Sequence, residues 1–191
     1  MAVDGKPMEH SSILRRTVHL SAPVFLVYYF LPSPLWYGGP PKEIGLLTVL
    51  AATMTFELAR LLIGFKVPGL RPYESDQMSA AAWTSVALTF SFLFFPIELT
   101  APVIFGMALV DPAISILRRT RWYPWLPYAM HLTVMLLVLA LLVPVDLRWL
   151  FAATVVSGAA VASEAVKTRY VDDDFLMIVV PLLVFFLTAG P

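Results

Sequence analysis

Three carboxylates stand out because each lies in a long apolar stretch of the chain. They are Glu57, Asp111 and Glu164, and each comes late in its stretch; Glu57 and Asp111 lie about one or two helical turns from the expected inner face of the membrane. An ionised carboxylate inside a bilayer is costly unless it is paired, hydrated or bound to a metal ion. The sequence therefore predicts that the three acids turn inward and share one polar pocket near one end of a helix bundle.

Further polar side chains are expected near the same end. They are the basic residues Arg15, Arg16, His19, Arg60, Arg71, Arg118 and Arg119 and the acidic run Asp172, Asp173 and Asp174. Carboxylate oxygens are ligands that Mg²⁺ prefers, and guanidinium groups bind phosphate oxygens through paired hydrogen bonds. A mixture of both is typical of a site that binds a polyphosphate together with a divalent cation.

Each of these features also has a plainer interpretation. Glu57 and Arg60 have the i, i+3 spacing of an ion pair within one helix. Asp111 precedes Pro112 and could cap a broken helix, because a residue before proline disfavours the helical conformation. The acidic run could cap the helix that follows it, and basic loops can reflect membrane topology alone. All of these alternatives stay open on the sequence.

The composition excludes a soluble globular domain. Of the 191 residues, 59% are hydrophobic and 14% are charged, and the mean hydropathy is +0.80. Typical soluble proteins carry about 25% charged residues. The net charge is zero, so no overall field attracts nucleic acid, and the absence of cysteine excludes disulfides and thiolate metal sites.

Seven windows are apolar enough for membrane helices of roughly 20 residues. They cover residues 17–35, 44–64, 78–97, 99–117, 123–144, 148–166 and 174–190. Lipid offers no hydrogen-bond partner to an open backbone, so helices are expected throughout. The sequence predicts an all-α, polytopic bundle that forms one integral membrane domain over residues 1–191, with its first helix retained.

The basic residues set the expected orientation. Of the 13 Lys and Arg residues, only Lys42 and Arg148 fall on the side opposite the amino terminus. Cytoplasmic loops carry an excess of Lys and Arg, so we expect a cytoplasmic amino terminus. The short charged loops favour a prokaryotic cell membrane over the membrane of an organelle.

Several short motifs follow one another along the chain. They are Arg15-Arg16-Thr-Val-His19, Glu57-Leu-Ala-Arg60, Arg71-Pro-Tyr-Glu74, Val110-Asp111-Pro-Ala113, and finally Glu164 with the acidic run Asp172–Asp174. In this order they resemble the dolichol kinase and phytol kinase family of CTP-dependent membrane lipid kinases, which is related to the phosphatidate cytidylyltransferases. The corresponding family motifs are Arg-Lys-x-x-His, Glu-Leu-x-Arg, Arg-x-x-Glu, Gly-Asp-x-x-Ala, and a closing Glu and Asp-Asp-Asn.

The resemblance implies a kinase that transfers a phosphoryl group from CTP to the hydroxyl of a polyprenol, a phytol-like alcohol or diacylglycerol at the cytoplasmic face. It implies Mg²⁺ held by Asp111, Asp172 and Asp173, and phosphates bound by His19 and the arginines. Glu57 or Glu164 would then act as general base or orient the ligands.

The longest departure from the family pattern follows Arg119. After Arg119 the chain reads Thr-Arg-Trp-Tyr-Pro-Trp-Leu-Pro, where kinases of this family carry Lys-Ser-x-Glu-Gly-Ser. Two other functions therefore stay open. One is a lipid-phosphate cytidylyltransferase, and the other is a transport or non-catalytic membrane protein that kept the fold.

Overall fold

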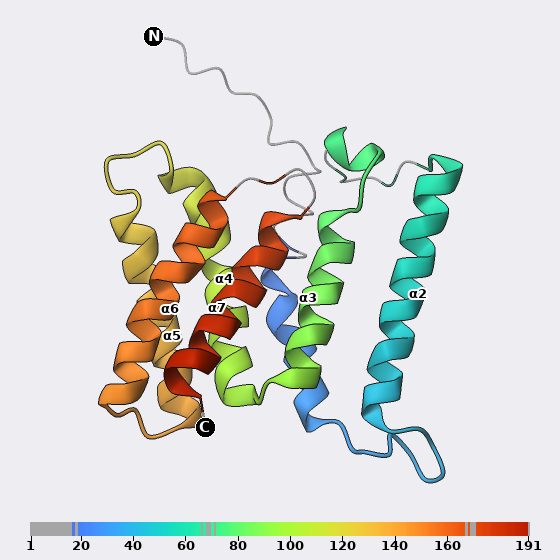
Figure 1. The fold of residues 1–191 in the computed structure, drawn as a ribbon, viewed down its shortest axis with the longest axis horizontal. Coiled ribbons are helices and arrows are strands. Elements are labelled where there is room, and N and C mark those ends of the chain that lie inside the picture. The colour runs from blue at the N-terminus through green and yellow to red at the C-terminus, as the bar shows by residue number, and fades with distance from the viewer. Residues whose placement is uncertain are drawn as a thin grey trace.

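The computed structural model describes residues 17, 19–65, 67, 70, 72–166, 168 and 171–190, and over these residues the chain is helical and contains no strand. Its elements are η1 (Ala22–Phe30), α2 (Lys42–Ile63), η2 (Pro72–Ser75), α3 (Ala80–Phe94), α4 (Ile97–Leu117), α5 (Trp125–Leu142), α6 (Leu147–Ala165) and α7 (Asp173–Ala189). The all-helical class is thus confirmed. Successive long helices run in opposite directions, and α2 lies at one edge of the bundle (Figure 1).

Local caps set several of the helix ends. The side chains of Ser79 and Asp146 accept hydrogen bonds from the backbone N–H groups of Ala82 and Trp149, which caps α3 and α6. α2 ends at Gly64, whose φ of 71° is a left-handed conformation that glycine adopts without steric cost. These ends place the polar connections at the two extremities of the bundle.

The first predicted span differs from the structure. The sequence predicts a membrane helix over residues 17–35, whereas in the structure residues 17, 19 and 20 are α-helical, Ala22–Phe30 form the 3₁₀ helix η1, and no helix continues past Phe30. Leu31 is extended, with a ψ of 140°, because the proline that follows it disfavours a further helical turn. The other predicted spans match α2 to α7, with ends shifted by a few residues.

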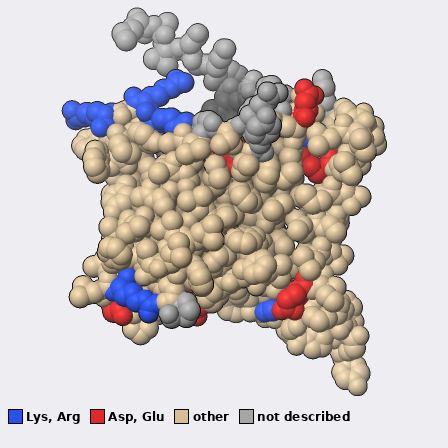
Figure 2. All heavy atoms as spheres, viewed as in Figure 1, with Lys and Arg blue, Asp and Glu red and all other residues tan. Residues whose placement is uncertain are grey.

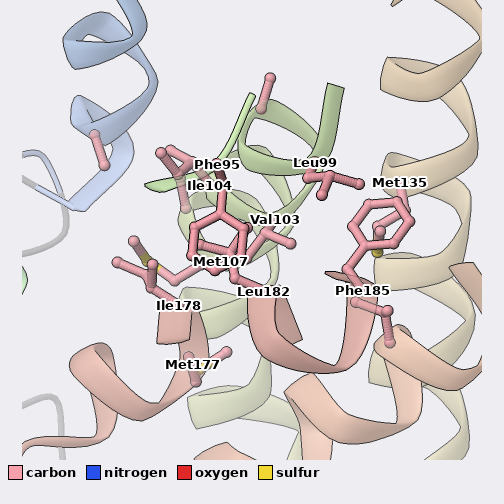
Figure 3. Packing of buried hydrophobic residues seen from close by; sticks show 14 of the residues in the cluster. Phe95, Leu99, Val103, Ile104, Met107, Met135, Met177, Ile178, Leu182 and Phe185 are labelled. Atoms are coloured by element: carbon pink, nitrogen blue, oxygen red, sulfur yellow. The ribbon is translucent and has the colours of Figure 1, made fainter. Parts of the chain in front are cut away.

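The apolar core forms around α4. Val103, Ile104 and Met107 of α4 are fully buried, and so are Leu182 and Phe185 of α7 (Figure 3). Of the most apolar part of α4, 61% is buried inside the protein, against 11% for α2. α4 is therefore the central helix, whereas α2 packs mainly on α3 and turns most of its surface outward.

Much of the outward surface is apolar. Val49 and Leu62 of α2 and Leu137 and Leu141 of α5 are all exposed. Figure 2 shows charged side chains gathered at two opposite ends of the molecule, with a broad band between them that lacks such side chains on the visible face. Among the described helices, α2, α4 and α5 are long and apolar enough to cross a membrane, and α3 is apolar but has only 15 residues.

Candidate functional site

One end of the bundle brings together polar residues from three separate parts of the chain. His19 precedes η1, Asp111 lies in the last two turns of α4, and Asp174 lies in the first turn of α7. Nε2 of His19 is 3.6 Å from Oδ2 of Asp111, and Nδ1 of His19 is 3.8 Å from Oδ1 of Asp174. We name these three residues the His–Asp cluster. One ligand atom from each residue lies within 4.8 Å of the other two.

The His–Asp cluster is enclosed on most sides. The side chains of His19 and Asp174 are 9% and 10% exposed, whereas the side chain of Asp111 is 25% exposed. Nε2 of His19 also lies 3.3 Å from the carbonyl oxygen of Met107, which fixes the ring against α4. A small ion or a phosphate group can therefore approach from the side of Asp111.

Helical periodicity explains why Asp174 points inward. It lies on the same face of α7 as the buried residues Met177, Ile178 and Pro181, at the spacing of successive helical turns. Asp172 is instead the N-cap of α7 and accepts a hydrogen bond of 3.1 Å from the backbone N–H of Asp174. The capping interpretation of the acidic run is therefore confirmed for Asp172. The same periodicity is the sequence signal for Asp174, which is not among the metal ligands predicted from the sequence.

Helix α4 continues past Asp111. Pro112 lacks the N–H that would bond to the carbonyl group four residues earlier, yet the helix extends to Leu117. The interpretation of Asp111 as the cap of a broken helix is therefore wrong. Asp111 is an internal residue of α4, and its side chain lies next to His19 in the His–Asp cluster.

Glu164 pairs with Arg118, which follows α4. Nη2 of Arg118 donates hydrogen bonds to the carboxylate of Glu164 and, at 3.2 Å, to its carbonyl oxygen. The hydrogen bond to the Glu164 carboxylate raises the pKa of Arg118 against the opposing effect of burial, and the charge of Asp173 makes a smaller contribution in the same direction. Since Asp173 precedes Asp174, this ion pair lies beside the acidic run. Arg118 thus remains charged next to the cluster.

Glu57 belongs to a second network, where α2 meets the start of α3. Its carboxylate accepts hydrogen bonds from Nε and Nη2 of Arg60, at 3.0 and 2.7 Å, and from the backbone N–H of Ser79, at 2.6 Å. Arg60 also donates to the carbonyl oxygens of Glu74 and Gln77, both at 2.8 Å. Glu57 and Arg60 are buried. Their interpretation as an ion pair within one helix is confirmed.

The predicted meeting of three acids in one pocket is therefore not what the structure has. Glu57 pairs with Arg60, Glu164 pairs with Arg118, and Asp111 lies beside His19. The physical reason is the packing of α2, whose main neighbour is α3, whereas α4 and α6 pack chiefly on α5 and α7. Two of the acids thus hold helices together, and only Asp111 lies at the His–Asp cluster.

The remaining predicted phosphate ligands divide into two groups. Arg119 is exposed in the turn that follows α4, at the same end of the bundle as Arg118. Arg15, Arg16 and Arg71 lie outside the described residues. Within the described part of the chain, the arginines near the His–Asp cluster are therefore those that follow α4.

Comparison with known proteins gives no match, since no family model, no curated protein and no solved structure matches the chain. What the site can do therefore rests on its own residues. Carboxylates and an imidazole can bind a cation, and the neighbouring guanidinium groups can bind phosphate.

Proposed function

We propose that the protein is a membrane lipid-alcohol kinase. It would transfer a phosphoryl group from a nucleoside triphosphate, CTP by resemblance, to the hydroxyl of a polyprenol, a phytol-like alcohol or diacylglycerol. The observation that carries the proposal is the His–Asp cluster. His19, Asp111 and Asp174 come from three motifs that resemble the kinase family, and these motifs lie far apart in the sequence yet meet at one point.

Phosphoryl transfer suits these residues. Its transition state needs positioning and neutralisation of charge more than covalent help from the protein. Arg118 is 39% exposed, and its nitrogens other than Nη2 make no hydrogen bond to the described residues, so they can bind phosphate oxygens. The exposed Arg119 follows directly and adds a second positive charge.

The acidic residues fit a divalent cation that accompanies the nucleotide. Asp111 and Asp174 supply carboxylate oxygens within 4.8 Å of each other, and those of Asp172, Asp173 and Asp174 are equally close together. Bound Mg²⁺ would offset the negative charge of the phosphates. Glu57 and Glu164 are held by arginines, so we assign them to positioning rather than to proton transfer.

The proposed setting is a bundle of seven membrane spans with the His–Asp cluster at the cytoplasmic face of a prokaryotic cell membrane. Arg118, Arg119 and Arg121 lie at the cluster end, whereas Lys42 and Arg148 lie at the other end. An excess of basic residues favours the cytoplasmic side, where nucleoside triphosphates are found. The lipid hydroxyl would approach from the inner leaflet.

The test is the Asp111→Asn variant, which keeps the shape of the side chain and removes its charge. Purified protein is incubated with labelled CTP or ATP and a panel of lipid alcohols. We expect the wild type to form a lipid phosphate and CDP or ADP, and the variant to be slower by about 10²-fold or more. Glu98→Gln is the matched control, because Glu98 lies in the first turn of the same helix at the opposite end.

Three results would speak against the proposal, either against its site or against its activity. Equal rates for Asp111→Asn and the wild type would remove Asp111 from the site. Release of pyrophosphate instead of CDP would favour the cytidylyltransferase. Absence of turnover with every nucleotide, together with proton-coupled flux in proteoliposomes, would favour a transporter, since acids within a membrane also mark ion pathways.

A further inference from the structure

One ring nitrogen of His19 contacts a backbone carbonyl group, which leaves the other ring nitrogen able to bind a metal ion. A carbonyl oxygen only accepts hydrogen bonds, so the contact of 3.3 Å between Nε2 and the carbonyl oxygen of Met107 requires a hydrogen on Nε2. The neutral ring then carries its lone pair on Nδ1, which faces Asp174. Metal-bound histidines commonly donate their second N–H to a backbone carbonyl group in this way.

Nδ1 of His19 has no hydrogen bond to the described residues, although the side chain is only 9% exposed. The nearest carboxylate oxygens lie 3.6 Å from Nε2 and 3.8 Å from Nδ1, which is longer than a hydrogen bond. Two donors on one ion with bonds of about 2.1 Å lie roughly 3.0–4.2 Å apart, depending on the coordination angle. The 3.8 Å between Nδ1 of His19 and Oδ1 of Asp174 lies within this range, so these two atoms are spaced as ligands of one cation rather than as hydrogen-bonded partners.

We propose that the His–Asp cluster is a divalent-metal site with one nitrogen donor and two carboxylate donors, and that it prefers a first-row transition ion such as Mn²⁺ over Mg²⁺. Mg²⁺ takes oxygen ligands in a strict octahedron and keeps several waters, whereas imidazole nitrogen is a good ligand for transition ions. The inference deepens the proposed kinase and rests on it for the role of the ion beside the nucleotide.

The side chain of Asp111 supports an accessible site. It is 25% exposed, against 10% for Asp174, so the cluster opens at its Asp111 side. Three protein donors leave at least one coordination position for water or for a phosphate oxygen. The ion would thus be fixed to α4 and α7 by the protein and would face the substrate on its remaining side.

The test measures metal binding to the full-length protein in nanodiscs without nucleotide. Mn²⁺ is titrated while its free concentration is followed by electron paramagnetic resonance. We expect one bound Mn²⁺ per chain, displaced by Mg²⁺ only at a concentration about 10-fold higher or more. Pulsed measurements on the bound ion are expected to detect a ¹⁴N coupling from imidazole, which requires no variant and therefore does not depend on how a mutant folds.

Two variants locate the nitrogen and oxygen donors. His19→Ala is expected to lose the ¹⁴N coupling and to weaken Mn²⁺ binding by at least about 10-fold, with less effect on Mg²⁺. Asp174→Asn is expected to weaken the binding of both ions. Glu98→Gln, an acid at the opposite end of α4, is the control and should leave binding unchanged.

The outcomes separate this inference from the kinase proposal. Absence of stoichiometric Mn²⁺ binding, bound Mn²⁺ without a nitrogen coupling, or unchanged Mn²⁺ affinity in His19→Ala each overturns the metal site. If the protein binds Mn²⁺ through His19 but turns over no nucleotide, the metal-site inference is supported and the kinase proposal is refuted. If the protein is a kinase whose metal has oxygen ligands alone, the kinase proposal is supported and the metal-site inference is refuted.

Discussion

The buried pair of Glu57 and Arg60 shows how an apolar helix keeps two charges without a ligand. The carboxylate has three donors, and the guanidinium reaches two carbonyl oxygens beyond its partner. These carbonyl groups belong to Glu74 and Gln77, between η2 and the start of α3, so the pair joins α2 to its neighbour. Removal of one partner from such a pair leaves an uncompensated buried charge, which costs about 3–5 kcal/mol.

We therefore expect Glu57→Gln to destabilise the protein by about 3 kcal/mol, because the amide keeps the shape of the side chain but leaves Arg60 without its counter-ion. Thermal denaturation in detergent measures the effect. The matched control is Glu43→Gln, which changes an exposed acid in the first turn of the same helix and should stay within about 0.5 kcal/mol. Equal melting temperatures for the two variants would show that the pair is dispensable.

Partners that are close in sequence could be predicted, and distant partners could not. The i, i+3 spacing identifies Glu57 and Arg60 as a pair, because one helix brings them together whatever surrounds it. Arg118 and Glu164 lie on different helices, and their contact depends on how α4 and α6 pack in the bundle. The sequence predicts that each acid needs a partner, but only tertiary packing selects it.

At the scale of helices, α4 contributes residues both to the apolar core and to the His–Asp cluster. Gly106 lets His131 of α5 lie directly on its backbone, and a Cβ atom at Gly106 would be only 2.5 Å from Nε2 of His131. His131 is fully buried, and its Nδ1 lies 3.1 Å from Oγ of Ser157 on α6. One small residue therefore sets the approach of three helices next to Met107, whose carbonyl oxygen contacts His19.

Gly106→Ala is expected to destabilise the protein by about 1–3 kcal/mol, since the new methyl group forces His131 out of a close-packed position. Gly158→Ala is the control, because the nearest atom to its Cβ is Cε2 of Tyr128 at 4.0 Å. Alanine there should be neutral or stabilise helix α6 by up to about 1 kcal/mol.

A double-mutant cycle tests the cause of the Gly106→Ala effect. If the clash with His131 is responsible, the Gly106→Ala/His131→Ala double variant loses less stability than the sum of the single variants. Strict additivity of the two losses would assign the effect to something other than this contact.

Helix prediction succeeded for the long apolar windows, including α4 and α7 with their internal prolines, and failed at the end of the first window, where the helix stops before a proline. α2 to α7 follow the apolar windows within a few residues, because lipid-compatible helices need long apolar runs. η1 has the same apolar character but ends at Leu31, before a proline. Backbone restriction by proline outweighs hydropathy in that segment.

At the scale of the whole molecule, the charged side chains that Figure 2 shows lie at two opposite ends of the visible face. The His–Asp cluster lies at one of these ends, where Arg118 and Arg119 directly follow α4, the helix that carries Asp111. This separation gives the proposed orientation its clearest test, because the two ends of the bundle must face different compartments if the helices cross a membrane.

The sequence contains no cysteine, so single cysteines can report the orientation without background labelling. Thr120 lies in the turn after α4 at the cluster end, and Val145 lies in the connection between α5 and α6 at the other end; both are exposed. We expect an impermeant maleimide to label Val145→Cys in intact cells and Thr120→Cys only after permeabilisation. The reverse pattern would place the cluster outside the cell and remove its access to cytoplasmic nucleotide.

The outward position of α2 has a practical consequence for handling the protein. With 11% of its apolar window buried, this helix leaves most of its apolar surface uncovered by the rest of the described chain, which suits contact with acyl chains. Its contacts with the rest of the chain include the Arg60 network at one end and a cation–π contact of Lys42 with Tyr28 at the other. Delipidation in a harsh, short-chain detergent should therefore detach α2 before it disturbs the helices around α4.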